Sequence, residues 1–494
     1  MEVLIPIGVL SIGAFFAYVI GRLSRSRSLT GLVAFVALLA AGYGVRETQN
    51  PVVEGELVSW PSKYDVGPIS AYMQADPLGV LLAALAIGLA ALVAVYSMRY
   101  MHKRNIGKFY GLLLLMTAGM VGIGFAGDLF TMYVFFEVMS IASFVLVAFE
   151  RDEWEPVEAG LKYLAISTAG SLMALLGIAL VYMYTNSLNL SVIPGLLIER
   201  SGSAEVAAII ALLVVGFGVK AAIVPMHTWL PDAHSAAPSG ISAMLSGIVI
   251  EAGLIAMIKA LIAVRAFDNG LLYALLALVT MFVGNLVALR QTDLKRLFAY
   301  SSVAQMGYIL MGVGLAMGFP VQAGFSGMQG GLYHILNHAI MKGGAFLCAG
   351  AFLYLVGTRD LRKLAGIGRQ APVVGVCLLI FVLALAGTPP LNGYFSKLLI
   401  AKAGADVGGW GVFMIVMLVF NSVISLFYYL RAANIVLFGA IPPGQQPIKP
   451  VPFLITLPIV VLAVLVVLLG VWPELGLQIV DPAAQHLDTL LLLN

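Results

Sequence analysis

Apolar runs long enough to cross a lipid bilayer recur along almost the whole chain and constrain its fold more than any other feature. About fourteen runs approach the 20 or so residues that a membrane-spanning helix needs, at residues 3–21, 30–46, 77–99, 108–126, 128–149, 159–184, 204–224, 239–263, 269–290, 298–318, 328–356, 371–399, 408–438 and 452–473. The composition agrees, because only 10% of the residues are charged, against about 25% in an average soluble domain. The runs are continuous rather than alternating, which excludes a β-barrel and predicts an all-α integral membrane protein.

Prolines interrupt two of the predicted helices in related settings. Pro225 follows Lys220 in the seventh run, and Pro389 and Pro390 follow Gly387 in the twelfth. Proline breaks a helix, and irregular backbone at membrane depth persists only where protein or water surrounds it. The two broken spans are five apart, an odd offset that predicts two inverted five-helix repeats. We therefore expect N-terminal spans 1–3 at 1–107, a first repeat of spans 4–8 at 108–264, a second repeat of spans 9–13 at 265–440, and a last span with a short tail at 441–494.

Ionisable side chains inside the apolar runs are the candidate functional residues. Each charge facing lipid would cost about 2.5–3.5 kcal/mol. The runs contain six such lysines and glutamates, and their combined cost would exceed the usual free energy of unfolding of about 5–15 kcal/mol. They must therefore face one another or water. The predicted polar file consists of Glu137, Lys220, Glu251, His334, His338, Lys342 and Lys397, and Lys259 is a further charge within a run.

Proton transfer is the chemistry that suits such a file. Burial disfavours a charged lysine and a nearby carboxylate favours it, so movement of Glu137 relative to Lys220 would load or unload a proton. His334, His338 and Lys342 are spaced at i, i+4 and i+8 on one helical face, and histidine is a natural relay between lysines.

Other chemistries fit the sequence poorly. His334 and His338 have the spacing of a zinc pair, but no third ligand is apparent, so we expect no metal. The glycines from Gly122 to Gly127 match a dinucleotide-binding pattern but lie between two spans with no strand before them, which favours helix packing. Two cysteines are too few for an iron–sulfur cluster. A phosphate-binding loop and basic patches with exposed aromatic residues are also absent, so we expect no cofactor and no nucleic-acid partner.

Basic residues predict the orientation of the chain in the membrane. The loops after spans 1, 3, 5, 7, 9, 11 and 13 contain sixteen lysines and arginines, and the other loops contain five. Because positive charge is retained on the cytoplasmic side, we expect both termini to lie outside the cytoplasm.

Five polar motifs occur in a fixed order within residues 75 to 440. They are Asp128-Leu-Phe-Thr-Met-Tyr-Val-Phe-Phe-Glu137, Pro225-Met-His227-Thr-Trp229-Leu-Pro231-Asp232-Ala-His234, Asp293-Leu-Lys295-Arg296, Tyr333-His334-x-x-Asn337-His338-x-x-x-Lys342 and Pro389-Pro-Leu-Asn-Gly-Tyr-Phe-Ser-Lys397. Together they resemble the antiporter-like subunits shared by Mrp-type cation/proton antiporters, respiratory complex I and membrane-bound hydrogenases. The length of the chain is similar to that of the Mrp D subunit, or of its counterpart in a hydrogenase or sulfur reductase complex.

The resemblance implies a fourteen-helix subunit with two inverted half-channels. Glu137 and Lys220 would form the coupling pair of the first half. The residues from His334 to Lys342 would bridge the halves, and Lys397 would be the terminal lysine of the second. Supporting polar or helix-breaking positions are Pro225, His227, Asp232, His234, Pro389, Pro390, Lys162 and Lys259.

Glu251 departs from the family pattern, which commonly places a basic relay residue in this stretch. We expect its carboxylate to pair with Lys220 or Lys342 and either to relay protons or to help Na⁺ pass.

The expected function is proton translocation, coupled to Na⁺, within a multisubunit complex of the cytoplasmic membrane. Other membrane subunits of an Mrp-like or hydrogenase-like complex are the expected partners. The chain itself would carry out no redox chemistry, although the complex around it can be an oxidoreductase; a quinone-reducing subunit is disfavoured because cofactor ligands are absent. The alternative is a catalytically silent scaffold whose buried Glu–Lys pairs only hold helices together.

Overall fold

Helices make up nearly all of the computed structural model, which describes residues 2–24, 26–53, 58–61, 71–101, 105–200, 202–267, 269–442 and 449–493. Within these ranges, 12 helices are long and apolar enough to cross a membrane. Two more crossings are made by pairs of shorter helices, α8 (Ala204–Lys220) with α9 (Trp229–Ala236) and α16 (Pro372–Ala386) with α17 (Asn392–Val407). The predicted all-α membrane fold with about fourteen spans is therefore confirmed.

The remaining elements follow in chain order. The N-terminal spans are η1 (Glu2–Leu4) with α1 (Ile5–Ser24), α2 (Arg27–Val53) and α3 (Pro77–Tyr100), and a small antiparallel pair, β1 (Val58–Trp60) and β2 (Met73–Ala75), lies between α2 and α3. The predicted first repeat holds α4 (Ile106–Phe125), α5 (Leu129–Val147), α6 (Trp154–Thr185), α7 (Ile193–Leu197), η3 (Ile198–Arg200), the α8–α9 pair, α10 (Ser239–Met244), the π-helical η4 (Leu245–Val249) and α11 (Ile250–Ala263). The predicted second repeat holds α12 (Gly270–Ala288), α13 (Leu294–Gly318), α14 (Pro320–Val356), α15 (Ile367–Gln370), the α16–α17 pair and α18 (Gly409–Phe438), and the chain ends with α19 (Phe453–Val471) and α20 (Pro473–Leu493).

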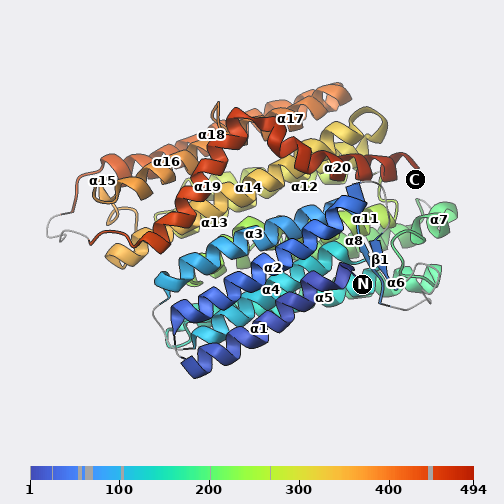
Figure 1. Cartoon of the computed structure of the whole chain (residues 1–494). Helices are drawn as coiled ribbons and strands as arrows, with labels where there is room; N and C mark the ends of the chain where they lie inside the picture. The colour runs from blue at the N-terminus through green and yellow to red at the C-terminus, as the bar shows by residue number, and fades with distance from the viewer. Residues whose placement is uncertain are drawn as a thin grey trace.

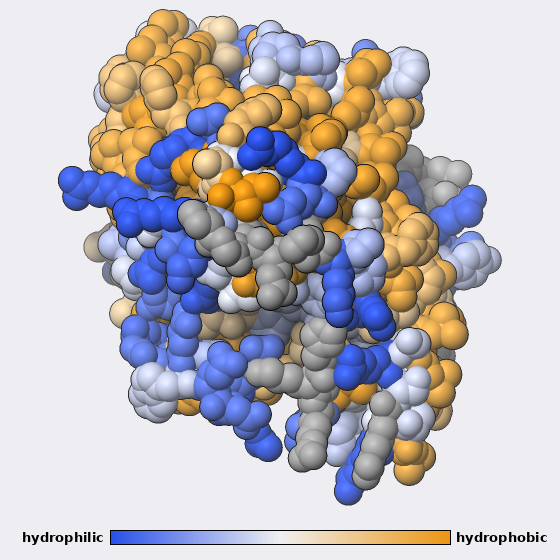
Figure 2. Space-filling model, turned by 90° about the vertical axis from the view of Figure 1, so that its left-hand side faces the viewer, coloured by the Kyte–Doolittle hydropathy of each residue, from blue (hydrophilic) through white to orange (hydrophobic). Residues whose placement is uncertain are grey.

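Both ends of the chain lie at the same end of the helix bundle, beside α7 and β1, whereas α15 lies at the opposite end (Figure 1). We call these the terminal end and the α15 end. Hydrophilic residues gather on the α15 end, and hydrophobic residues cover much of the flanks around it (Figure 2). A polar end framed by apolar flanks is the surface that a bilayer requires of a membrane protein.

Aspartates fix where three of the spanning helices begin. Asp76, Asp128 and Asp293 precede α3, α5 and α13, and each accepts a hydrogen bond from the backbone N–H three residues later, at 2.6, 2.7 and 2.9 Å respectively. Such a cap satisfies a donor that the helix leaves free and contributes about 1 kcal/mol. Because the caps fix the residue at which each helix begins, they also fix how deep in the membrane the later side chains of these helices lie.

The two predicted breaks are present. Helix α8 ends at Lys220, and the chain resumes a helix only at Trp229. Helix α16 ends at Ala386 and is followed by Gly387, whose φ of +87° suits glycine because it has no side chain to clash. The breaks confirm that the seventh and twelfth crossings are discontinuous, with a lysine beside each.

A further interruption occurs in a segment that we expected to be a last span and a short tail. Helix α19 ends at Val471, and the short tail after it forms α20, which packs along α14. Gly470 lies directly against the backbone of Pro390, at the α16–α17 break, where a side chain on residue 470 would clash. The junction of α19 and α20 therefore lies beside the break in the twelfth crossing.

Candidate functional site

Lys220 is fully buried at the end of α8, in a chamber of aromatic rings. Its Nζ donates hydrogen bonds to the Tyr163 hydroxyl at 2.8 Å and the Ser167 hydroxyl at 3.3 Å. The same nitrogen lies 4.5 Å from the ring centre of Tyr163 and 4.8 Å from that of Phe144. Trp229 stacks on Tyr163 with ring centres 3.9 Å apart. Aromatic faces attract a cation, so this chamber can hold an ammonium group, although no carboxylate among the described residues contacts it.

Glu137 is half-buried on α5 and does not touch Lys220. Among the described residues Glu137 forms no ion pair, and its carboxylate accepts a short hydrogen bond from Ser171. Ser167 and Ser171 lie one turn apart on α6, so one contacts the lysine and the other contacts the glutamate. The two members of the predicted pair therefore contact neighbouring serines on α6 rather than each other. Charge-based reasoning missed them, although their i, i+4 spacing in an apolar run was a visible signal.

Glu251 binds His338, which corrects the expectation that it would pair with Lys220 or Lys342. One carboxylate oxygen lies 2.6 Å from His338 Nδ1, and both side chains are 0% exposed. Glu251 Oε2 and His338 Nε2 have no hydrogen-bond partner within the described part of the chain. Glu251 lies two residues after the end of the π-helical η4, which changes the direction in which the following side chains point. The centre of the molecule thus holds a carboxylate–imidazole pair with spare capacity for protons on both sides.

Lys342 and His334 lie on the same helix as His338. Lys342 Nζ donates to the backbone carbonyl of Phe298 at 2.8 Å and to the hydroxyl of Ser301. The rings of His334 and His338 are nearly parallel, with centres 6.4 Å apart. The three α14 residues therefore form one buried row, as the spacing predicted.

His334 connects this row to Lys397. Its Nδ1 lies 2.8 Å from the Ser396 hydroxyl, next to Lys397 in sequence, and its Nε2 lies 2.8 Å from Gln305 Oε1. Lys397 Nζ donates to the carbonyls of Leu385 and Ala386 at 3.2 and 3.1 Å. These carbonyls end α16, where the helix dipole is negative and favours a cation.

Three charged positions from the sequence lie away from the buried row. Lys259 pairs with Asp76 at 2.8 Å and donates to the carbonyl of Gly124 at 2.5 Å. Lys162 and Asp232 pair with each other at 3.1 Å, and Asp232 also contacts Arg296 at 3.1 Å. These groups join helices together and do not touch the buried row.

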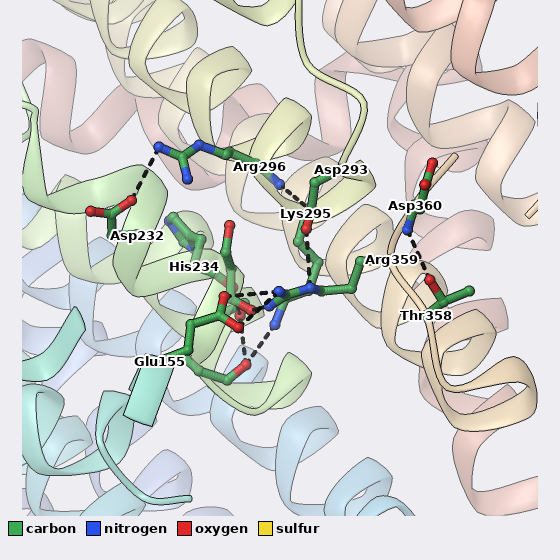
Figure 3. A network of polar contacts seen from close by, with 12 residues as sticks. Glu155, Asp232, His234, Asp293, Lys295, Arg296, Thr358, Arg359 and Asp360 are labelled. Atoms are coloured by element: carbon green, nitrogen blue, oxygen red, sulfur yellow. Dashed lines mark hydrogen bonds and ion pairs between the residues drawn. The ribbon is translucent and has the colours of Figure 1, made fainter. Parts of the chain in front are cut away.

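Asp232 belongs to a polar network that links four segments of the chain (Figure 3). Arg359 contacts Glu155 at 2.8 Å and Asp293 at 3.0 Å, while Lys295 donates to the carbonyl of Ala237 at 2.5 Å. A cavity of about 560 Å³ opens here and is lined by residues that include Glu155, Lys295 and Arg359. The network therefore ties α6, α9, α13 and the segment after α14 together beside this cavity.

Two histidines complete the predicted positions. His234 is fully buried, stacks on Phe346 with ring centres 4.7 Å apart, and has no hydrogen-bond partner for either ring nitrogen within the described residues. His227 lies in the break after α8 and is half-buried, with its ring 6.4 Å from that of Tyr300. Pro225 lies in the same break, as Pro389 and Pro390 lie in the second.

Comparison with known proteins places this geometry among membrane subunits. Residues 126–425 match the family model described as NADH:quinone oxidoreductase/Mrp antiporter, transmembrane, and residues 65–110 match the model for the N-terminus of chain 5 of NADH–ubiquinone oxidoreductase. The F(420)H(2) dehydrogenase subunit N of Methanosarcina mazei is 32% identical over 94% of both chains. One of the Na(+)/H(+) antiporter subunits of Alkalihalophilus pseudofirmus is 32% identical over 80% of this chain and 78% of its own. Among solved structures, a chain of an archaeal membrane-bound sulfane sulfur reductase superposes with a TM-score of 0.87 at 28% identity, over 99% of this chain and 98% of that one.

Proposed function

The chain belongs to the NADH:quinone oxidoreductase/Mrp antiporter family of membrane subunits, and from that premise we propose that it moves protons across the membrane as one subunit of a larger complex. The observation that carries the proposal is the row of buried ionisable groups between the two helix breaks. Such groups are costly in a membrane and are found where ions or protons pass.

The proposed route begins at Lys220 and ends at Lys397. Lys220 can give up its proton when Glu137 is remote and regain it when the carboxylate approaches. The Glu251–His338 pair, at 2.6 Å, then holds a proton between the halves. His334 passes it to the Ser396 hydroxyl, which is within hydrogen-bond distance at 2.8 Å, and on towards Lys397, the next residue in the sequence.

Glu137 supports the assignment of membrane partners. The carboxylate lies on a spanning helix and is only half-buried in this chain, next to the exposed apolar side chains Val134 and Ile141. A carboxylate facing lipid would cost about 2.5–3.5 kcal/mol, so a neighbouring membrane subunit would cover it in the assembled complex.

The orientation follows from the basic loops. We place the α15 end in the cytoplasm and both termini outside, since the loops richer in lysine and arginine reach the α15 end. The count of basic residues in the loops includes four that lie outside the described residues, namely Arg25, Lys63, Lys103 and Arg104.

The parent complex decides what drives transport. The relatives include a dehydrogenase subunit and an antiporter subunit, so the driving force would be either electron flow in partner subunits or an existing Na⁺ gradient. Mass spectrometry of the complex purified in mild detergent distinguishes them, because only a redox complex would bring iron–sulfur subunits with it.

Replacement of Lys220 by alanine tests the function itself. The complex would be placed in liposomes and proton entry followed with a pH-sensitive dye under an imposed potassium diffusion potential. We expect Lys220→Ala to lower proton flux by at least about tenfold, as for loss of a group that exchanges protons. Lys363→Ala, which removes an exposed lysine at the α15 end, is the matched control. Unchanged flux through an intact Lys220→Ala complex would instead identify the chain as a silent scaffold.

A further inference from the structure

Helix α20 runs along the half of α14 that leads from the polar file to the terminal end. Gly476 packs against the ring of Tyr333, Asp481 accepts a hydrogen bond of 2.8 Å from Gln329 Nε2, and the Asp488 carboxylate fills the space beside Gly324. These contacts follow α14 backwards in order, so the two helices are antiparallel. The C-terminus lies at the terminal end (Figure 1).

The acidic residues of α20 share one face. Glu474, Asp481 and Asp488 are seven residues apart, which is two helical turns and a rise of about 10.5 Å. Ile479 and Leu492 are exposed on the remaining surface of the helix. Asp481 and Asp488 both touch α14 beside a buried apolar face of α20 that includes Val480, Ala484 and Leu487, whereas Glu474 is exposed.

Polar groups on α14 continue beyond the polar file towards the terminal end. Gln329 is five residues before His334, a rise of about 7.5 Å. Ser326, one further turn along, donates a hydrogen bond of 2.7 Å to Asp406 at the end of α17. Buried donors on α14 thus meet one carboxylate from α20 and one from α17, on the side of the polar file that faces the terminal end.

Asp481 is half-buried and, among the described residues, forms no ion pair with a basic side chain. A carboxylate inside a membrane protein without a cation to balance it is costly, and a single amide donor offsets only part of that cost. Such a group is expected to take part in ion movement.

We infer that Asp481 is the proton acceptor between the polar file and the terminal end, and that α20 is one wall of this outward path. The step is a simple proton transfer: the proton leaves Lys397 at the end of the polar file, passes through water molecules, and neutralises the Asp481 carboxylate. Asp481 then releases it to water at the terminal end. The inference rests on the proposed function, because it extends the same route by one residue.

Replacement of Asp481 by asparagine tests this role without removing the contact. The asparagine Oδ1 can accept the same hydrogen bond from Gln329, so assembly should persist, but asparagine cannot take up a proton. In the liposome assay we expect Asp481→Asn to lower proton flux at least about tenfold and Asp481→Glu to restore most of it. Glu199→Gln is the matched control, since it removes an exposed carboxylate in η3, which adjoins α7 at the terminal end.

The outcomes separate this inference from the proposed function. If Lys220→Ala abolishes flux and Asp481→Asn leaves it unchanged, the chain moves protons and Asp481 only holds α20 to α14. If flux falls equally in Asp481→Asn and Asp481→Glu, the carboxylate is structural and the inference is wrong. If neither Lys220→Ala nor Asp481→Asn alters flux, the proposed function fails as well.

Discussion

Replacement of Glu251 by glutamine should interrupt the centre of the proton route while preserving its shape. Glutamine can keep the 2.6 Å contact with His338 but loses the negative charge. Charges spread over a carboxylate and an imidazole in contact are centred about 4 Å apart, and at an effective dielectric of 20 they attract by about 4 kcal/mol. The protonated form of His338 would therefore become about a thousandfold less populated.

The liposome assay measures the consequence of this change directly. If proton transfer through His338 limits the rate, flux should fall by between about tenfold and a thousandfold. Glu158→Gln removes an exposed carboxylate from α6 and serves as the control. The amount of assembled complex, measured by size-exclusion chromatography, should be the same for both variants. Full flux through an assembled Glu251→Gln complex would refute the argument, because the pair would then carry no proton.

Two further predictions concern stability and coupling. Asp76→Asn breaks the ion pair with the buried Lys259 and should destabilise the complex by about 3–5 kcal/mol, which would lower the midpoint of thermal unfolding. The proton flux per assembled complex should stay normal. A loss of flux at full stability would instead place this ion pair in the proton route. Ser171→Ala removes the hydroxyl that contacts Glu137, so it should lower proton flux severalfold and the free energy of unfolding by about 1 kcal/mol. Normal flux would show that this hydroxyl does not couple Glu137 to Lys220.

The membrane crossings and the buried charges were predictable because both follow from large energy terms. A bilayer demands long apolar helices, so the spans are visible as runs, and it penalises charge, so Lys220, Lys342 and Lys397 stand out in the sequence. The helix breaks were predictable for the same kind of reason, since Pro225 and Pro389 each remove a backbone donor and interrupt the hydrogen bonds of a helix.

The partners of these groups were not predictable, because they depend on small angular differences. The π-helical η4 ends two residues before Glu251 and changes the direction of its side chain, so spacing alone could not identify His338 as its partner. Ser167 and Ser171 carry no charge and cost little in an apolar run, so burial arguments did not single them out. Only the packing of α20 on α14 brought Asp481 to Gln329, 152 positions apart in the sequence.

The rings around Lys220 bear on which ions can use this part of the molecule. A metal cation in a protein replaces its hydration shell with several oxygen ligands, whereas the contacts of the Lys220 nitrogen are two hydroxyls and aromatic faces. A proton needs only the lone pair of that nitrogen. The surroundings of Lys220 thus suit the passage of a proton and lack the oxygen ligands that a dehydrated sodium ion needs, so the proposed coupling to sodium would use a site other than this chamber.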